Sequence, residues 1–68
     1  MRSVKIGDLM KIKVGDSPGE ETSLMRKGDV VKVIGIYPYN IMVERIKGYK
    51  LRRCYPRASW FINLEKTL

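Results

Sequence analysis

The segment that most constrains the fold is residues 30–37, which read Val-Val-Lys-Val-Ile-Gly-Ile-Tyr. β-Branched and aromatic residues are enriched in strands, so this segment predicts a β-strand. Pro38-Tyr39-Asn40 follows directly. Proline cannot donate to a strand ladder and asparagine tolerates turn geometry, so the strand is expected to end there. The chain must therefore build its core around an extended central segment.

Four further segments carry strand patterns. In residues 4–14, Met10, Ile12 and Val14 alternate with Lys11 and Lys13, which predicts a half-buried strand with a short lead-in through Val4 and Ile6. The Lys47-Gly48 pair predicts a tight turn between two later strands. The remaining strands are expected over residues 41–46, 49–54 and 60–64, with a break that forms one short 3₁₀ turn over residues 55–59.

Residues 15–27 are polar and rich in turn formers, which predicts a long loop or an irregular hairpin. Ser17-Pro18-Gly19-Glu20 also resembles a helix N-terminus, so a short helix is the competing interpretation. Gly19 and the lack of a following apolar repeat favour the loop. Its acidic residues, Asp16, Glu20 and Glu21, would repel a phosphate backbone.

With 68 residues the chain is expected to form a single domain over residues 1–68. Five short strands without a convincing helix predict an all-β fold. A small open sheet would expose hydrogen-bonding edges, so a small closed or nearly closed five-stranded barrel is expected.

The order of these elements resembles that of Src-homology-3-type small barrels, over residues 8–64. The matching features are the strand Leu9 to Val14, the long acidic loop, the tight Lys47-Gly48 turn and the short turn at Pro56. Residues 24–34, Leu-Met-Arg-Lys-Gly-Asp-Val-Val-Lys-Val-Ile, resemble the family's hydrophobic-x-Lys-Gly-Asp signature. Residues 28–35 are also similar to the Gly-Asp-x-Val-x-Val pattern that opens KOW domains. Small bacterial and phage proteins with such barrels commonly bind nucleic acid or another protein, which the resemblance implies here.

Two departures from the family patterns bear on function. The signalling members carry Ala-Leu-Tyr-Asp-Tyr on the first strand and paired tryptophans on the third, where this chain has Ile41-Met42. Those aromatics form the groove for polyproline peptides, so proline-peptide binding is not expected. The KOW resemblance is incomplete as well, since no Lys-Gly-x-x-Gly follows Ile36.

The basic run from residue 45 to residue 57 carries the functional prediction. It holds six positive charges and no negative one, and the whole chain has a net charge of +7. Cations fixed on a hairpin between aromatic side chains suit a polyanion whose bases can stack. Tyr49 is expected to pack in the core or at the rim of the barrel. The candidate nucleic-acid contacts, to DNA or RNA, are Arg45, Lys47, Lys50, Arg52, Arg53, Arg57, Tyr39, Tyr55 and Trp60. Regular strand alternation would point Arg52 and Arg53 to opposite faces.

Several function classes are not expected. The chain has no histidine, one cysteine and no Cys-x-x-Cys pair, so neither catalysis nor a metal site nor a cofactor is predicted, and no small-molecule substrate. Cys54 is expected to be a small buried residue. The single cysteine and the lack of a long apolar run or signal peptide favour a cytoplasmic protein without membrane contact. The alternative function is a protein-interaction adaptor, such as a small phage or mobile-element protein, that docks on an acidic protein surface.

Overall fold

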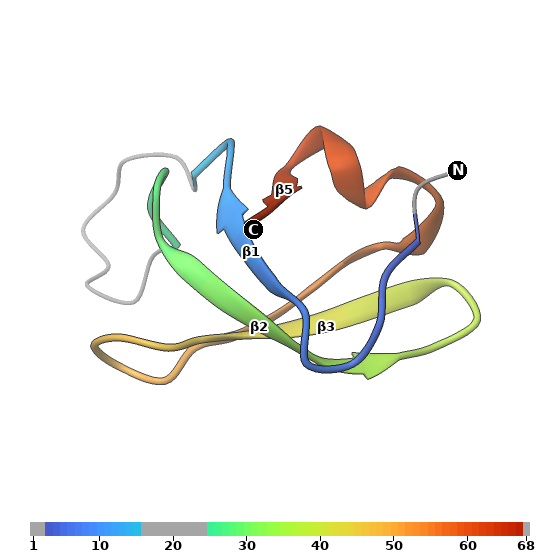
Figure 1. The fold of residues 1–68 in the computed structure, drawn as a ribbon, viewed down its shortest axis with the longest axis horizontal. Coiled ribbons are helices and arrows are strands. Elements are labelled where there is room, and N and C mark those ends of the chain that lie inside the picture. The colour runs from blue at the N-terminus through green and yellow to red at the C-terminus, as the bar shows by residue number, and fades with distance from the viewer. Residues whose placement is uncertain (1–2, 16–24, 68) are drawn as a thin grey trace.

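The computed structural model describes residues 3–15 and 25–67 of the chain. The chain forms one five-stranded antiparallel sheet with the strand order β4-β3-β2-β1-β5, curled into a half-barrel (Figure 1). The elements are β1 Leu9–Ile12, β2 Val30–Ile36, β3 Asn40–Arg45, β4 Arg52–Pro56, the 3₁₀ helix η1 Arg57–Ile62 and β5 Leu64–Lys66. The all-β prediction with five strands is confirmed.

Alternation along the strands builds the core on the concave side of the sheet. In β2, Val31 and Val33 are fully buried while Lys32 between them is exposed. Met10 and Ile12 of β1 are buried as predicted, because successive strand residues face opposite sides. Ile41 and Val43 of β3 complete the same layer, and Met25, Tyr55, Trp60 and Leu64 close it.

A bulge bends β2 near its end. The register with β3 shifts between Val33 and Gly35, which adds one residue to β2. The ring of Tyr37 lies over Gly35, and a Cβ there would come within 2.8 Å of the Tyr37 hydroxyl oxygen. Gly35 therefore permits the close approach of the Tyr37 ring to the bulged part of β2.

The first strand is shorter than predicted. The lead-in through Val4 and Ile6 is not a strand, because the Asp8 carboxylate accepts a hydrogen bond from the Lys5 N–H at 2.9 Å and Gly7 has a φ of +97°. These contacts form a turn instead. Val14, predicted to face the core, lies beyond β1 and is 55% exposed. The predicted loop of residues 15–27 lies mostly outside the described residues.

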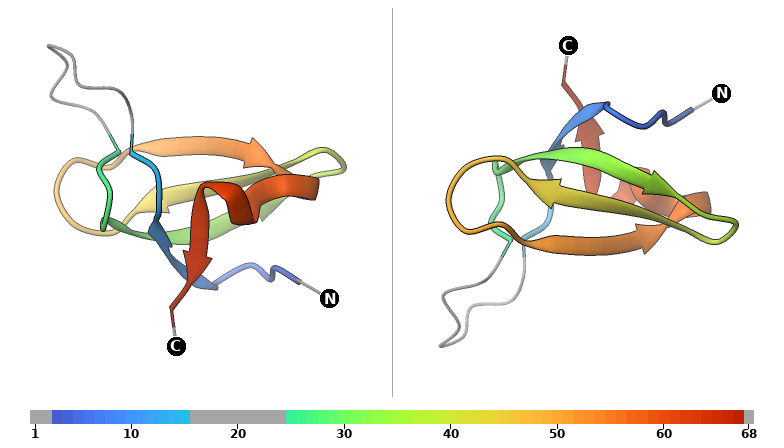
Figure 2. Two further views of the ribbon diagram at one scale, coloured as in Figure 1. Left: turned by 90° about the horizontal axis from the view of Figure 1, so that it is seen from above. Right: turned by 90° about the horizontal axis from the view of Figure 1, so that it is seen from below.

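The last predicted strand, over residues 60–64, is wrong. Residues 57–62 form η1, which buries Trp60 and leaves Ile62 58% exposed, and β5 begins only at Leu64. The reason is topological. β4 and β5 lie at opposite edges of the sheet, so the chain must cross the open side of the half-barrel between them (Figure 2).

The two edge strands leave the sheet open. β4 pairs with β3 and β5 pairs with β1, and the ladders of the described strands do not include a β4–β5 pair. The observed architecture is therefore a half-barrel with η1 across its opening. The predicted closed barrel is not confirmed.

Candidate nucleic-acid interface

The β3–β4 loop, residues 46–51, lies at one end of the hairpin that carries the basic run (Figure 1). It is wider than the predicted Lys47-Gly48 turn, because Arg45 N–H donates to the Leu51 carbonyl and β4 begins at Arg52. Lys47 and Lys50 are exposed, and Tyr49 is 74% exposed. This exposure differs from the predicted packing of Tyr49 in the core or rim, so the structure adds an aromatic side chain to this surface.

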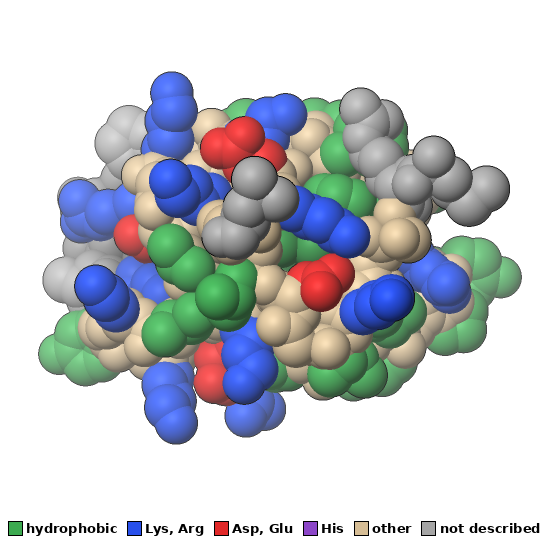
Figure 3. Space-filling view, in the orientation of Figure 1, with side chains coloured by type: hydrophobic (Ala, Val, Ile, Leu, Met, Phe, Trp, Pro, Cys, Tyr) green, Lys and Arg blue, Asp and Glu red, His purple; other side chains and the backbone are tan. Residues whose placement is uncertain are grey.

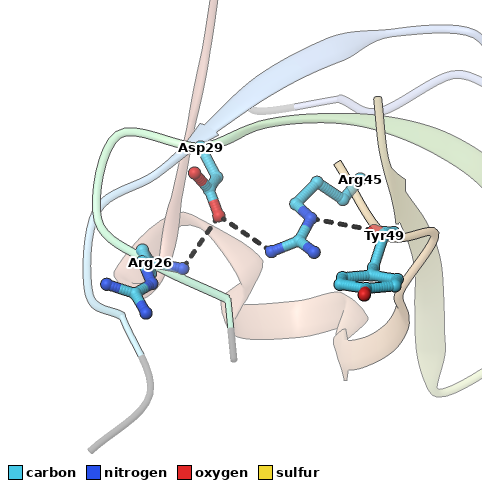
Figure 4. Close-up of polar contacts among 4 residues, drawn as sticks. All are labelled: Arg26, Asp29, Arg45 and Tyr49. Atoms are coloured by element: carbon cyan, nitrogen blue, oxygen red, sulfur yellow. Dashed lines mark hydrogen bonds and ion pairs between the residues drawn. The ribbon is translucent and has the colours of Figure 1, made fainter. Parts of the chain in front are cut away.

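The Arg45 side chain contacts the backbone of this loop and does not face solvent. Its Nε donates to the Tyr49 carbonyl oxygen at 3.0 Å, and its Nη1 lies 3.6 Å from Oδ2 of Asp29 (Figure 4). The Arg45 side chain is only 10% exposed. Gly48, with a φ of +85°, passes over the guanidinium, where a Cβ would lie 3.6 Å from Nη2. Arg45 is therefore a clamp for the loop, and its geometry does not suit the predicted phosphate contact.

Asp29 connects this clamp to the turn before β2. Its Oδ2 also accepts a hydrogen bond from the Arg26 N–H at 3.0 Å, and the Asp29 N–H donates to the Arg26 carbonyl (Figure 4). Gly28, with a φ of +94°, closes the same turn. Gly28 and Asp29 thus shape a turn, and the Asp29 carboxylate forms an ion pair with Arg45. Asp29 therefore neutralises Arg45, one of the six cations of the basic run.

Arg52 lies next to the loop and is engaged on one side. Its Nε donates to Oε2 of Glu44 at 2.9 Å across β3 and β4. That hydrogen bond, with smaller contributions from the charges of Arg52, Lys50 and Lys32, lowers the pKa of the Glu44 carboxyl. The Arg52 side chain remains 66% exposed, so its other guanidinium nitrogens are open to solvent and to an anion.

The other end of the hairpin presents a second exposed tyrosine. Tyr39, in the turn before β3, is 85% exposed, as its position in the turn predicts. Arg57 lies beside it: its N–H donates to the Tyr39 carbonyl, and its Nη1 donates to the Tyr37 carbonyl at 3.4 Å. An exposed cation and an exposed tyrosine therefore lie on neighbouring backbone segments here, as Lys47, Lys50 and Tyr49 do in the β3–β4 loop.

Tyr55 and Trp60, the other two predicted stacking residues, lie in the core at 6% exposure each. Trp60 packs edge-on against Phe61, with ring centroids 6.1 Å apart and an interplanar angle of 80°. Their burial takes them off the candidate surface. Arg53 and Cys54 of β4 are both exposed, so the edge strand displays side chains from both of its faces, and the expectation of a buried Cys54 is wrong.

Charge alone does not outline the interface. In the view of Figure 3, Lys and Arg side chains surround the face, and separate Asp and Glu side chains lie between them. What distinguishes the β3–β4 hairpin is the combination of exposed tyrosines at both ends with exposed cations in its loop and on β4. No sequence pattern singled out Tyr49, because its exposure depends on the width of the loop.

Other kinds of site were sought in residues 3–15 and 25–67. That part of the chain contains no group of three His, Cys, Asp or Glu side chains placed to hold a metal ion. Its helical segment is too short to cross a membrane. Comparison with protein-family models, curated proteins and solved structures gives no match for this chain. The geometry of the hairpin is therefore the best indication of function.

Proposed function

We propose that this protein is a non-enzymatic nucleic-acid-binding module that uses the β3–β4 hairpin as its contact surface. Lys47, Lys50, Arg52 and Arg57 would contact phosphates, and Tyr49 or Tyr39 would stack on bases. The half-barrel with its connecting 3₁₀ helix is compatible with the Src-homology-3-like and KOW-like architecture that the sequence resembles. We include that assignment, and a small bacterial or phage origin, in the proposal.

The observation that supports this function best is the fixed exposure of Tyr49 between Lys47 and Lys50. Both lysines and the ring are exposed, while the backbone beneath them is held by the Arg45 side chain. A held loop loses less conformational entropy when it binds than a mobile one, so its cations can act together. An aromatic face between two cations suits a base between its flanking phosphates.

Fluorescence anisotropy with labelled DNA and RNA, each single- and double-stranded, tests the proposal. Each neutralised phosphate contributes about −0.7 to −0.9 to the slope of log affinity against log salt. Four contacts predict a slope of about −3 to −4, which is roughly 50- to 150-fold weaker binding when salt rises from about 0.05 to 0.2 M. Lack of binding to all four probes at the lower salt would reject the function.

An acidic protein surface is the alternative partner, because its carboxylates would bind the same cations. Polyglutamate of matched charge distinguishes the two, since it offers carboxylates without bases. If the protein is a nucleic-acid module, an oligonucleotide should displace bound polyglutamate when both are present at equal charge concentration. If polyglutamate instead competes on equal terms and Tyr49→Ala leaves both affinities unchanged, the adaptor function is the better description.

A further inference from the structure

The two most exposed tyrosines of the described residues, Tyr39 and Tyr49, lie at opposite ends of one edge of the sheet. Tyr49 belongs to the β3–β4 loop and Tyr39 to the turn before β3, and these segments lie at the two ends of the β3–β4 hairpin (Figure 2). At a rise of about 3.3 Å per residue, the backbone from residue 39 to residue 46 spans roughly 23 Å. The edge strand β4 runs along this span between them.

The β4 edge itself is cationic and directs backbone N–H groups away from the sheet. Arg45 N–H donates to the Leu51 carbonyl and Arg57 N–H to the Tyr39 carbonyl, so the odd-numbered residues of this strand direct their polar groups toward β3. Arg52 and Cys54 therefore direct their N–H groups outward, away from β3. Backbone N–H groups beside arginine side chains are typical phosphate contacts.

The same edge is unsuited to pairing with another strand. Pro56 lacks a backbone N–H, and two arginines lie side by side at its start, both of which are features that discourage strand addition. An extended polyanion fits this edge better than an extended peptide does.

We infer that the β4 edge binds a short extended single strand of nucleic acid, with one base stacked on Tyr49 and another on Tyr39. This inference rests on the proposed function and specifies its ligand. At about 3.4 Å per stacked nucleotide, the span corresponds to roughly seven nucleotides, or fewer if the strand is stretched. In a duplex the bases are already stacked on one another, so they could not use both tyrosines.

Length and stacking can be separated in one experiment. Labelled oligothymidine and oligouridine of roughly 4, 8 and 12 nucleotides, and a duplex of the longest length, are titrated against wild type, Tyr39→Ala and Tyr49→Ala. For the two longer strands, each substitution should weaken binding by roughly 5- to 150-fold, the equivalent of one lost base stack. With its bases stacked, the shortest strand spans about 14 Å and contacts one tyrosine at a time, so each single substitution should weaken its binding less than that of the longer strands.

Tyr39→Phe and Tyr49→Phe are the matched controls, since each keeps the ring and should retain the wild-type affinity. Comparison of oligothymidine with oligouridine tells whether DNA or RNA is preferred. Binding that depends on the lysines but not on either tyrosine, or that is equally tight for duplex and single strand, would overturn this inference and leave the proposed function standing. Lack of any binding at low salt would remove both.

Discussion

The two edges of the sheet, β4 and β5, differ in how their charges are balanced. At the β5 edge, Lys66 lies 3.4 Å from the Asp8 carboxylate, and Glu65 lies next to it in sequence. The N–H of Lys5 and the charge of Lys66 lower the pKa of Asp8, so this carboxylate stays charged beside its lysine. At the β4 edge, Arg52 and Arg53 follow each other without an acidic neighbour in the strand.

This difference shows which edge of the sheet can attract an anion through the excess positive charge of the chain. Around β5 the charges form local pairs, which weaken the field that a distant anion feels. Along β4, Glu44 is the carboxylate in contact with Arg52, and it reaches across from β3. If the asymmetry governs binding, substitutions at the two edges should differ in their effects.

The largest effect is expected where η1 joins the two edges. Trp60 is 6% exposed and lies in the core cluster between β4 and β5. Trp60→Ala should lower the free energy of unfolding by about 3–5 kcal/mol. Since a chain of this size has only about 3–10 kcal/mol in total, much of the variant should be unfolded. Urea denaturation followed by circular dichroism measures the loss.

Ile62→Ala is the control for that experiment, because Ile62 belongs to the same 3₁₀ helix and is 58% exposed. It should change the free energy of unfolding by less than about 0.5 kcal/mol. A Trp60→Ala variant as stable as Ile62→Ala would mean that η1 does not fasten the two edges, and that Trp60 is available as a surface residue.

The next effect concerns the clamp beneath the β3–β4 loop. Arg45→Ala removes the hydrogen bond to the Tyr49 carbonyl and leaves the Asp29 carboxylate without its partner in β3. We expect a loss of about 1–3 kcal/mol in the free energy of unfolding, since a charged group in a largely buried contact is involved. The same denaturation measurement applies.

Arg26→Ala is matched to it in charge. Arg26 contacts Asp29 through its backbone N–H, and its side chain points away from that carboxylate (Figure 4). The substitution should therefore leave stability within about 0.5 kcal/mol of wild type. Equal losses for the two variants would show that net charge, and not the clamp, sets the effect.

A third prediction compares the hairpin tip with the neighbourhood of β5 directly. Lys47→Gln with Lys50→Gln, and Lys5→Gln with Lys11→Gln, each remove two exposed positive charges. The first pair should weaken single-strand binding by roughly 10- to 30-fold at about 0.1 M salt and reduce the salt slope by about 1.4. The second pair should change affinity by less than about threefold. Anisotropy titrations over a salt series measure both, and equal losses would place the contact surface elsewhere.

Much of the fold follows from local pattern. The β-branched run of β2 and the alternation of Met10 with Ile12 identify strands and their buried faces without reference to the rest of the chain. The apolar residues from Trp60 to Leu64 predicted a buried strand. The same pattern also fits a connecting segment that places one large side chain in the core. Which of the two forms depends on where β4 ends and where β5 must begin, and that is a property of the whole sheet.

The site was predictable in composition but not in role. The basic run identified the right hairpin, yet Arg45 faces Asp29, a residue distant in sequence that strand pairing brings close. Alternation places Arg45 on the same side as Val43, whereas the contact with Asp29 needs the register between β2 and β3. Tyr49 and Tyr55 exchange their expected places for the same kind of reason, since β4 starts at Arg52 and its alternation then buries Tyr55.

The smallest effect concerns the acidic residue that Arg52 contacts. Glu44→Gln removes one negative charge near the β4 edge and frees the Arg52 guanidinium, so single-strand affinity should rise by roughly two- to fivefold. Glu65→Gln removes the same charge at the β5 edge and should raise affinity less.

The pKa of Glu44 is lowered in the folded state, so its ion pair stabilises the fold above the ordinary pKa of 4.5 and loses this effect as pH falls through the lowered value. The stability difference between wild type and Glu44→Gln should therefore be full at neutral pH and vanish in acid, while Asp8, shifted in the same direction, keeps its own acid dependence in both proteins. A difference that persists unchanged below that range would show that Glu44 acts through packing and not through its charge.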